Sequence, residues 1–221
     1  MAIDRRGWLR HSSVWLAAGI AGAAAAAGAP ARQGGKAPTI LIVGDSLSAE
    51  YGLARGSGWV ALLEKRLAVE RIDANVVNAS ISGETTAGGR SRFPALLAQH
   101  RPQIVVLELG GNDALRGLPL ASTRDNLRDM ARRAKAAGAQ VVVVGMQIPP
   151  NFGRKYADDF AAVFEGVAKS EGAALVPFLL KGVADAADPE ALFQSDRIHP
   201  RAEAQPRMLD NVWPVLKPLL T

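Results

Sequence analysis

Ser46, Asp196 and His199 are the residues of this chain whose types and spacing are suited to covalent chemistry. A serine hydroxyl is a poor nucleophile at neutral pH and needs a base within hydrogen-bonding reach. Of the three histidines, His11 lies in the N-terminal stretch, and His100 ends a predicted helix, where it suits the helix dipole. His199 instead follows Asp196 by three residues in a nonhelical stretch. A carboxylate so close could hold the imidazole in one tautomer, as the acid of a hydrolytic triad does.

Attack on an acyl carbonyl also requires donors for the oxyanion that forms. The backbone N–H groups of Ser46 and Gly83 and the side-chain amide of Asn112 are the candidates. Removing one such donor typically costs about 2.7–4 kcal/mol of transition-state stabilisation. These groups lie far apart in sequence, so the prediction depends on a fold that brings them together.

Each of these motifs also has a purely structural interpretation. Asp45 and Ser46 together, or Asp196 alone, are good helix caps. Asn112 is a common turn residue. The hydroxyl-rich loop from Ser80 to Thr86 reads equally well as a turn and helix start, with Thr85 or Thr86 as N-cap.

Other catalytic templates are missing. No serine lies in a Gly-x-Ser-x-Gly elbow, and the chain has no His-Glu-x-x-His, phosphate-binding loop or dinucleotide-binding glycine pattern. There are no cysteines, which excludes disulfides and thiol catalysis, and we expect neither a metal ion nor a cofactor. The net charge of +5 is dispersed and aromatic residues are 5% of the chain, so we expect no nucleic-acid partner.

Strand-like and helix-like segments alternate along the chain. We expect strands at 39–43, 75–79, 104–109, 141–144 and 174–176. We expect helices at 59–71, 123–137, 156–170 and about 202–219, and another that follows the N-cap at Thr85 or Thr86 and runs to about residue 100. This alternation predicts a parallel sheet with helices on both faces. If the first strand is central, the loops that bear Ser46, Gly83 and Asn112 meet at one edge, where such sheets bind ligands.

The first residues read as an export signal. Arg5, Arg6 and Arg10 precede an uncharged Ala- and Gly-rich stretch that ends in Ala29-Pro30-Ala31. We assign residues 1–31 to a signal peptide, of twin-arginine or general secretory type, 32–38 to a flexible lead-in and 39–221 to the folded domain. The protein is therefore expected to be periplasmic or secreted, with no stable membrane span, at most transient lipid contact, and a monomeric or weakly dimeric state.

Four sequence blocks resemble the SGNH (GDSL) hydrolases, in that family's order. They are Gly44-Asp45-Ser46-Leu47-Ser48, Ser82-Gly83-Glu84-Thr85, Gly110-Gly111-Asn112-Asp113 and Asp196-Arg197-Ile198-His199-Pro200. The residues at 78–86 and 107–117 resemble the periplasmic acyl-CoA thioesterase, lysophospholipase and arylesterase branch. This resemblance implies a flavodoxin-like three-layer α/β/α sandwich with a five-stranded sheet. It also implies a nucleophile at Ser46, an oxyanion hole at Ser46, Gly83 and Asn112, and a base at His199 with Asp196 as its partner.

The resemblance further implies hydrolysis of aryl esters, acyl-CoA thioesters and lysophospholipids, small-molecule substrates that need no cofactor. It places an acyl groove at Leu115, Pro119, Ile148, Pro149 and Asn151. Two residues depart from the pattern: Glu50 and Arg197 stand where a small residue, Gly, is usual, and both lie beside the predicted site. A carbohydrate acetylesterase and a noncatalytic acyl-lipid binding protein are the competing hypotheses.

Overall fold

The computed structural model describes residues 37–148 and 152–220. The predicted signal peptide, 1–31, and residues 32–36 of the predicted lead-in lie outside the described residues. The described chain forms a five-stranded, fully parallel sheet in the order β2-β1-β3-β4-β5. Its strands are β1 (Thr39–Gly44), β2 (Asn75–Asn78), β3 (Ile104–Glu108), β4 (Gln140–Val144) and β5 (Ala174–Val176). Strand β1 lies between β2 and β3, so the condition under which the loops bearing Ser46, Gly83 and Asn112 meet at one edge is satisfied, and this strand order is the flavodoxin-like one.

The strands at the centre of the sheet are covered on both faces. Every residue of β1 and β3 is buried, and in β4 only Gln140 is exposed. Strands β1 and β3 therefore appear in the sequence as continuous apolar runs, which is typical of parallel sheets with helices on both faces. Edge strand β2 is more exposed, with Asn75 and Asn78 at the surface.

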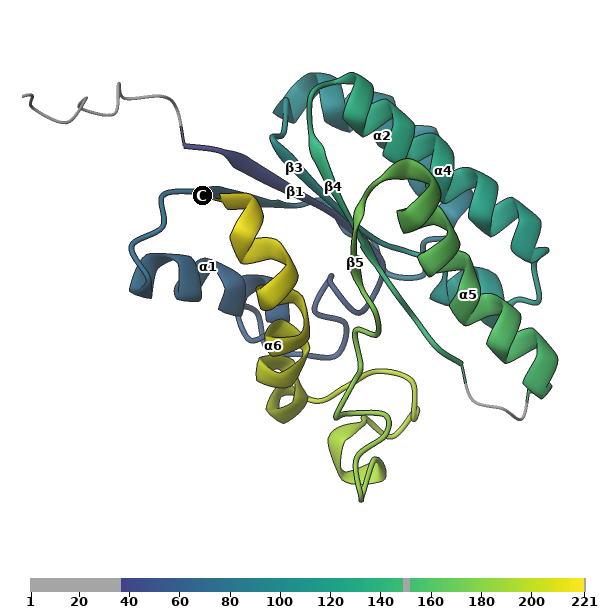
Figure 1. The fold of residues 1–221 in the computed structure, drawn as a ribbon. Coiled ribbons are helices and arrows are strands. Elements are labelled where there is room, and N and C mark those ends of the chain that lie inside the picture. Colours follow the sequence, from purple (N-terminus) through teal and green to yellow (C-terminus); the bar gives the residue numbers. More distant parts are fainter. Residues whose placement is uncertain (1–36, 149–151, 221) are drawn as a thin grey trace, which may run out of the picture. The chain divides into compact units, whose positions relative to one another are not determined.

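Two layers of helices enclose the sheet (Figure 1). On one face α1 (Trp59–Val69) packs against α6 (Gln205–Leu216). On the other face α4 (Leu120–Ala136) packs between α2 (Thr86–His100) and α5 (Arg154–Glu171). The predicted three-layer sandwich is thus confirmed.

The predicted final helix, 202–219, is not continuous. It consists of a 3-10 turn η3 (Ala202–Ala204), the α-helix α6, and a second 3-10 turn η4 (Lys217–Leu220). Pro206 falls in the first turn of α6, where a missing N–H costs nothing, so the α-helix proper begins there. Among the smaller differences, α1 ends at Val69 rather than near residue 71, α4 begins at Leu120 rather than at residue 123, and a short helix α3 (Gly111–Leu115) was not expected.

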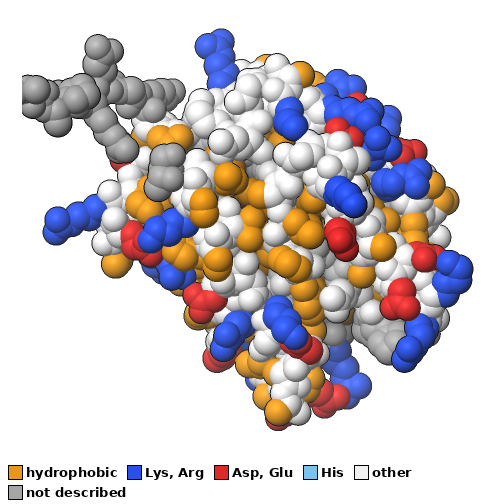
Figure 2. Space-filling view, viewed as in Figure 1, with side chains coloured by type: hydrophobic (Ala, Val, Ile, Leu, Met, Phe, Trp, Pro, Cys, Tyr) orange, Lys and Arg blue, Asp and Glu red, His pale blue; other side chains and the backbone are white. Residues whose placement is uncertain are grey.

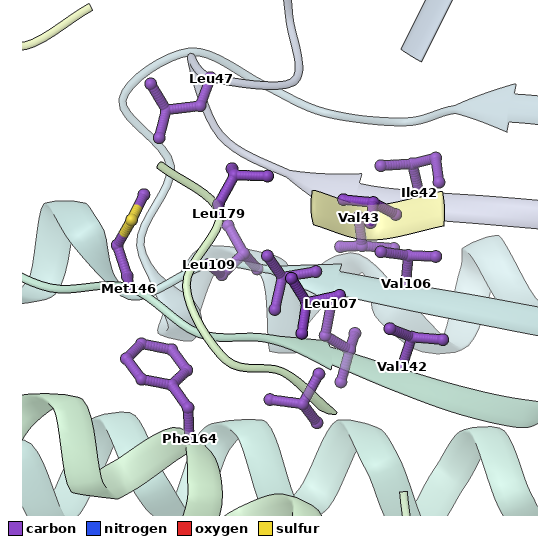
Figure 3. Packing of buried hydrophobic residues seen from close by; sticks show 14 of the residues in the cluster. Ile42, Val43, Leu47, Val106, Leu107, Leu109, Val142, Met146, Phe164 and Leu179 are labelled. Carbon is purple, nitrogen blue, oxygen red and sulfur yellow. The ribbon is translucent and has the colours of Figure 1, made fainter. Parts of the chain in front are cut away.

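The core continues past the carboxyl ends of the strands. Figure 3 shows the side chains of Ile42, Val106 and Val142 side by side on the central strands, with Leu109 and Met146 beyond the strand ends. All five side chains are buried. The loops that follow the strands are therefore anchored on apolar packing, which limits how far the polar groups on them can move.

Charged side chains of both signs cover the surface outside this core. On the face drawn in Figure 2, Lys and Arg are interspersed with Asp and Glu, and apolar side chains lie between them. Within residues 37–148 and 152–220 no helix combines the length and the hydropathy that crossing a membrane would require.

Candidate active site

The turn after β1 presents Ser46 at the carboxyl edge of the sheet. Asp45 Oδ1 accepts a hydrogen bond from Leu47 N at 3.0 Å, and Asp45 O accepts from Ala49 N at 3.0 Å. No helix starts here, so the alternative that Asp45 and Ser46 serve as helix caps is wrong. Ser46 itself is half-buried between two buried neighbours, Asp45 and Leu47.

His199 reaches this turn from an irregular segment late in the chain. An antiparallel bridge joins Phe193 to Pro200, and Gln194 N donates to His199 O at 2.8 Å. The side-chain amide of Gln194 donates to Tyr51 O at 2.9 Å, which ties the segment to the end of the Ser46 turn. The hairpin-like closure of 193–200 therefore sets where the imidazole lies.

Ser46, His199 and Asp196 form a continuous hydrogen-bonded series. His199 Nε2 lies 2.9 Å from Ser46 Oγ, and His199 Nδ1 lies 2.6 Å from Asp196 Oδ2. Because the carboxylate can only accept, Nδ1 carries the proton and Nε2 accepts from the serine hydroxyl. This is the tautomer in which an imidazole can act as a general base toward the serine.

Asp196 is held as a carboxylate by its local contacts. Its Oδ1 accepts from Ile198 N at 2.9 Å and from His199 N at 3.0 Å. Partial burial acts to raise the pKa of Asp196, but the hydrogen bonds from His199 and Ile198 outweigh it and lower that pKa to about 2. Asp196 does not cap the final helical segment, whose N-cap residue is Arg201.

Tyr51 contacts the imidazole and was not predicted. The centroids of the Tyr51 and His199 rings are 4.3 Å apart, with the planes tilted by 37°. Half of the Tyr51 side-chain surface remains exposed. Nothing in the sequence pattern marks this residue, because the contact joins two loops that are distant along the chain.

Gly83 lies in the loop after β2, close to the Ser46 turn. The neighbouring Ile81 N donates to Gly44 O at 3.1 Å, which extends the pairing of the first two strands into their loops. Gly83 has a φ of 78°, a conformation that favours glycine. Within residues 37–148 and 152–220, no protein group accepts a hydrogen bond from Ser46 N or from Gly83 N. Both N–H groups can therefore donate to a substrate.

Asn112 joins the exits of the first three strands. Its side-chain Nδ2 donates to Asp45 Oδ2 at 3.0 Å and to Glu84 O at 3.1 Å. Both hydrogens of this amide thus have protein partners, and an oxyanion would have to share or replace one of these bonds. Thr85 accepts from Gly88 N at 3.3 Å as the N-cap of α2, which confirms the helix-start interpretation of that part of the loop.

Asp45 and Asp113 are buried carboxyl groups near the site. The sequence did not indicate the structural role of either. Burial raises the pKa of Asp45 to about 6, although the hydrogen bonds from Leu47 N and Asn112 and the charge of His199 act to lower it. Asp113 is also buried and accepts from Thr86 N at 2.8 Å and Thr123 Oγ1 at 3.3 Å, which docks the first turn of α2 onto α3 and α4. In the sequence both residues appear only as neighbours of candidate catalytic residues.

The residues predicted to form an acyl groove are only partly described. Leu115 is 42% exposed and Pro119 is exposed, while Ile148 is half-buried against the core. Pro149 and Asn151 lie outside the described residues. Two surface cavities of about 310 and 410 Å³ are lined by residues of 182–210 and by Gln147 with residues of 177–211, respectively, and neither is lined by Ser46 or His199.

Comparison with known proteins identifies the family. Residues 42–206 match the model of the GDSL-like Lipase/Acylhydrolase family, which is most of the described domain. The chain belongs to this family. This acylhydrolase is accordingly an enzyme that hydrolyses esters, as the geometry of Ser46, His199 and Asp196 suits it to do.

Relatives of this acylhydrolase support the same conclusion. It is 55% identical to Esterase TesA of Pseudomonas aeruginosa over 184 residues, which covers 83% of this chain and 90% of the relative. It is 41% identical over 184 residues to "Thioesterase 1/protease 1/lysophospholipase L1" of Escherichia coli, which covers 83% of this chain and 86% of the relative. Among solved structures it is similar to the esterase EstA from Pseudoalteromonas sp. inhibited by monoethylphosphonate, with a TM-score of 0.77 and 40% identity over 82% of this chain and 98% of that one.

The two departures from the family pattern both have left-handed backbone. Glu50 has a φ of 59° and Arg197 a φ of 58°, which explains why glycine is usual there. The Glu50 carboxylate accepts from Gly56 N at 3.0 Å and from Gly58 N at 2.7 Å, so it organises the loop before α1. The Arg197 guanidinium forms an exposed ion pair with Glu190 at 3.3 Å. In the described part of the chain, neither charged side chain forms a hydrogen bond or an ion pair with Ser46 or His199.

Proposed function

We propose that Ser46 is the nucleophile of this esterase, His199 its general base and Asp196 the group that orients the base. The observation that carries this proposal is the hydrogen-bonded series from Ser46 Oγ through His199 to Asp196, with distances of 2.9 and 2.6 Å. A serine from the turn after β1 meets a histidine and an aspartate from a segment near the end of the chain, in the order and tautomer that acyl transfer requires.

The first half of the reaction forms an acyl-enzyme. Ser46 Oγ attacks the acyl carbonyl while His199 Nε2 takes its proton, and the negatively charged Asp196 stabilises the imidazolium that results. The carbonyl oxygen becomes an oxyanion and receives hydrogen bonds from Ser46 N and Gly83 N. Asn112 contributes a third bond by giving up or sharing one of its contacts with Asp45 and Glu84.

The acyl-enzyme is complete once His199 gives this proton to the leaving alcohol, phenol or thiol and the bond from the acyl carbon to that group breaks. The second half regenerates the enzyme: a water molecule gives a proton to His199 Nε2 and attacks the acyl carbon, and the same donors stabilise the second oxyanion. As the bond from the acyl carbon to Ser46 Oγ breaks and the carboxylic acid leaves, His199 returns the proton to Ser46 Oγ. The two half-reactions use the same residues, so loss of any one should slow both.

We infer that the substrates include aryl esters, acyl-CoA thioesters and lysophospholipids. The relatives that are 41–55% identical include proteins named for esterase, thioesterase, lysophospholipase and arylesterase activity. The exposed Leu115 and Pro119 and the half-buried Ile148 provide apolar surface at the same edge of the sheet for an acyl chain.

The test of this proposal is Ser46→Ala in the mature protein. Turnover of p-nitrophenyl esters, acyl-CoA and lysophospholipids should be abolished, and an organophosphonate that labels the wild-type protein should no longer attach. Labelling at another residue, or preserved turnover, would contradict the proposal. Acetylated sugars hydrolysed much faster than all three classes would instead establish the acetylesterase alternative.

We also propose that the protein is exported and that residues 1–31 are removed on export. The basic Arg5-Arg6 pair, the uncharged stretch and the Ala29-Pro30-Ala31 end support this. N-terminal sequencing of protein recovered from the periplasm or medium should start near Arg32. A cytoplasmic protein that retains Met1 would refute it.

A further inference from the structure

Glu108 is a buried acid that the proposed reaction does not use. It ends β3 in parallel register beside Gly44, the last residue of β1, and only 2% of its surface is exposed. A carboxyl group in such an apolar setting is costly unless its polar atoms have partners. Its partners therefore indicate what it does.

Those partners lie on both sides of Ser46. Glu108 Oε2 accepts a hydrogen bond from Ser48 Oγ at 2.7 Å and another from Asp45 N at 3.3 Å. Ser48 Oγ in turn accepts from Trp59 Nε1 at 3.2 Å, which links the group to α1. One carboxyl oxygen thus binds the residue before the nucleophile and the residue two positions after it.

The backbone of β1 leaves room for this contact. A Cβ atom at Gly44 would lie 2.7 Å from Glu108 Oε2 and 2.8 Å from Ser48 Oγ, closer than real Cβ contacts. Gly44 has no positive φ that would call for glycine. The close approach of the carboxyl and the hydroxyl is therefore the physical reason for a glycine at this position.

We propose that Glu108 is a positioning residue that holds the turn 45–48, and with it Ser46 Oγ and Ser46 N, in place for acyl transfer. This inference rests on the proposed role of Ser46. A shift of the reacting groups by about 1 Å can slow a reaction by about 100-fold. Glu108 prevents such a shift by fixing the turn to the neighbouring strand, and it acts without touching the substrate.

The hydrogen bonds that Glu108 accepts do not require it to carry a negative charge. Burial, and the charge of Asp45 beside it, raise the pKa of Glu108 well above its ordinary value. A neutral carboxylic acid still offers an acceptor oxygen to Ser48 and Asp45. Glutamine has the same shape and also offers a carbonyl oxygen, so it should replace Glu108, whereas an apolar residue should not.

The experiment compares Glu108→Gln with Glu108→Leu, using p-nitrophenyl esters and an organophosphonate. We expect kcat of Glu108→Gln within about threefold of wild type, and kcat of Glu108→Leu lowered about 100-fold with KM unchanged. The rate of Ser46 labelling should fall in parallel with kcat. Full activity of Glu108→Leu, an effect on KM alone, or equal losses in the two variants would overturn the proposal.

A second variant keeps the test decisive if Glu108→Leu does not fold. Ser48→Ala removes the 2.7 Å contact with Glu108 and also the acceptor of the 3.2 Å hydrogen bond from Trp59 Nε1. It should lower kcat about tenfold through loss of the contact with Glu108, with KM unchanged. Unchanged kcat in a folded Ser48→Ala would overturn the proposal. Added to a folded Glu108→Leu, Ser48→Ala should have little further effect, because the two residues act through one contact.

Glu171→Gln is the matched control. Glu171 is also buried, but it pairs with Arg128 and Arg132 between α4 and α5. This change should lower the melting temperature and leave kcat and KM unaltered, which separates loss of a buried carboxylate from loss of positioning. The outcome is distinct from failure of the proposed function, which would show as turnover or labelling in Ser46→Ala.

Discussion

Two different physical means hold the segment of Ser46, the proposed nucleophile of this esterase, and the segment of His199, its proposed base. The turn 45–48, which bears Ser46, rests on buried carboxyl groups of Asp45 and Glu108 whose pKa values are raised. The segment 193–200, which bears His199, closes on itself through short-range hydrogen bonds, and the pKa of Asp196 is lowered. The first arrangement costs stability at neutral pH, and the second contributes to it.

This difference shows which contacts fix the position of each half of the site. The Ser46 turn depends on groups distant in sequence, because Glu108 and Asn112, which bind it, come from β3 and α3. The His199 segment carries its own acid three residues away, so its local geometry follows from residues close in sequence. The two halves meet through the Ser46–His199 contact, the Tyr51 ring and the Gln194 amide.

Asp196→Asn should have the largest effect of the changes that probe this comparison. The amide would donate where the carboxylate accepts, which favours the wrong imidazole tautomer and removes the charge that stabilises the imidazolium. We expect kcat to fall by about 10³–10⁴-fold, as for the equivalent change in a serine protease triad. Steady-state kinetics with a p-nitrophenyl ester measures this, and a loss below tenfold would show that Asp196 does not orient His199.

Asp45→Asn should have the next largest effect on turnover. Asp45 Oδ2 accepts a hydrogen bond from Asn112 Nδ2 at 3.0 Å. An amide NH2 group in place of this oxygen cannot accept that bond, so the Asn112 side chain would rotate out of its present position. Because an oxyanion donor is worth about 10²–10³-fold in kcat, we expect a loss of about 100-fold with KM little changed. If kcat remained within threefold of wild type, Asn112 would not depend on Asp45.

The contributions of Asp45 and Asp196 to the free energy of unfolding should change with pH in opposite directions. The pKa of Asp45 is raised from 3.8 to about 6, so between these values the folded state binds more protons and the free energy of unfolding falls as pH rises. The shift of about two units at about 1.4 kcal/mol each corresponds to roughly 3 kcal/mol. The pKa of Asp196 is lowered to about 2, so its contribution is instead lost as pH falls from about 4 to 2.

Urea unfolding at a series of pH values separates these contributions. Asp45→Asn should flatten the decline between pH 4 and 6, and Asp196→Asn should flatten the decline below pH 4. Glu108→Gln should act in the same direction as Asp45→Asn, since burial raises the pKa of Glu108 too. Identical pH profiles in wild type and Asp45→Asn would show that Asp45 is not the group responsible.

Arg197→Gly should have the smallest effect. Glycine relieves the left-handed strain at φ 58°, worth about 1 kcal/mol, but it adds freedom to the unfolded chain and removes an exposed ion pair worth at most about 1 kcal/mol. We expect the free energy of unfolding within about 1 kcal/mol of wild type and kcat/KM within twofold for short and long acyl esters. A tenfold change for one acyl length would show that Arg197 contacts substrate.

The sequence by itself determined the strand and helix order, because buried strands need continuous apolar runs and the covering helices need one apolar stripe. It also marked Ser46, Gly83, Asn112, Asp196 and His199, since their types and the turn residues around them are legible in short windows. The place of β1 between β2 and β3 was only a condition of the sequence argument, because the alternation of strands and helices does not fix the order of strands in the sheet.

Only the tertiary structure decided which groups fix these residues in place. Glu108 reads in the sequence as part of a strand, Tyr51 as part of a loop, and Asp45 and Asp113 as neighbours of more obvious residues. Their roles arise from contacts between segments 27 to about 150 residues apart, such as Thr86 with Asp113 or Tyr51 with His199. Burial, which shifts a pKa or makes a hydrogen bond matter, is a property of the packed chain and has no counterpart in the linear pattern.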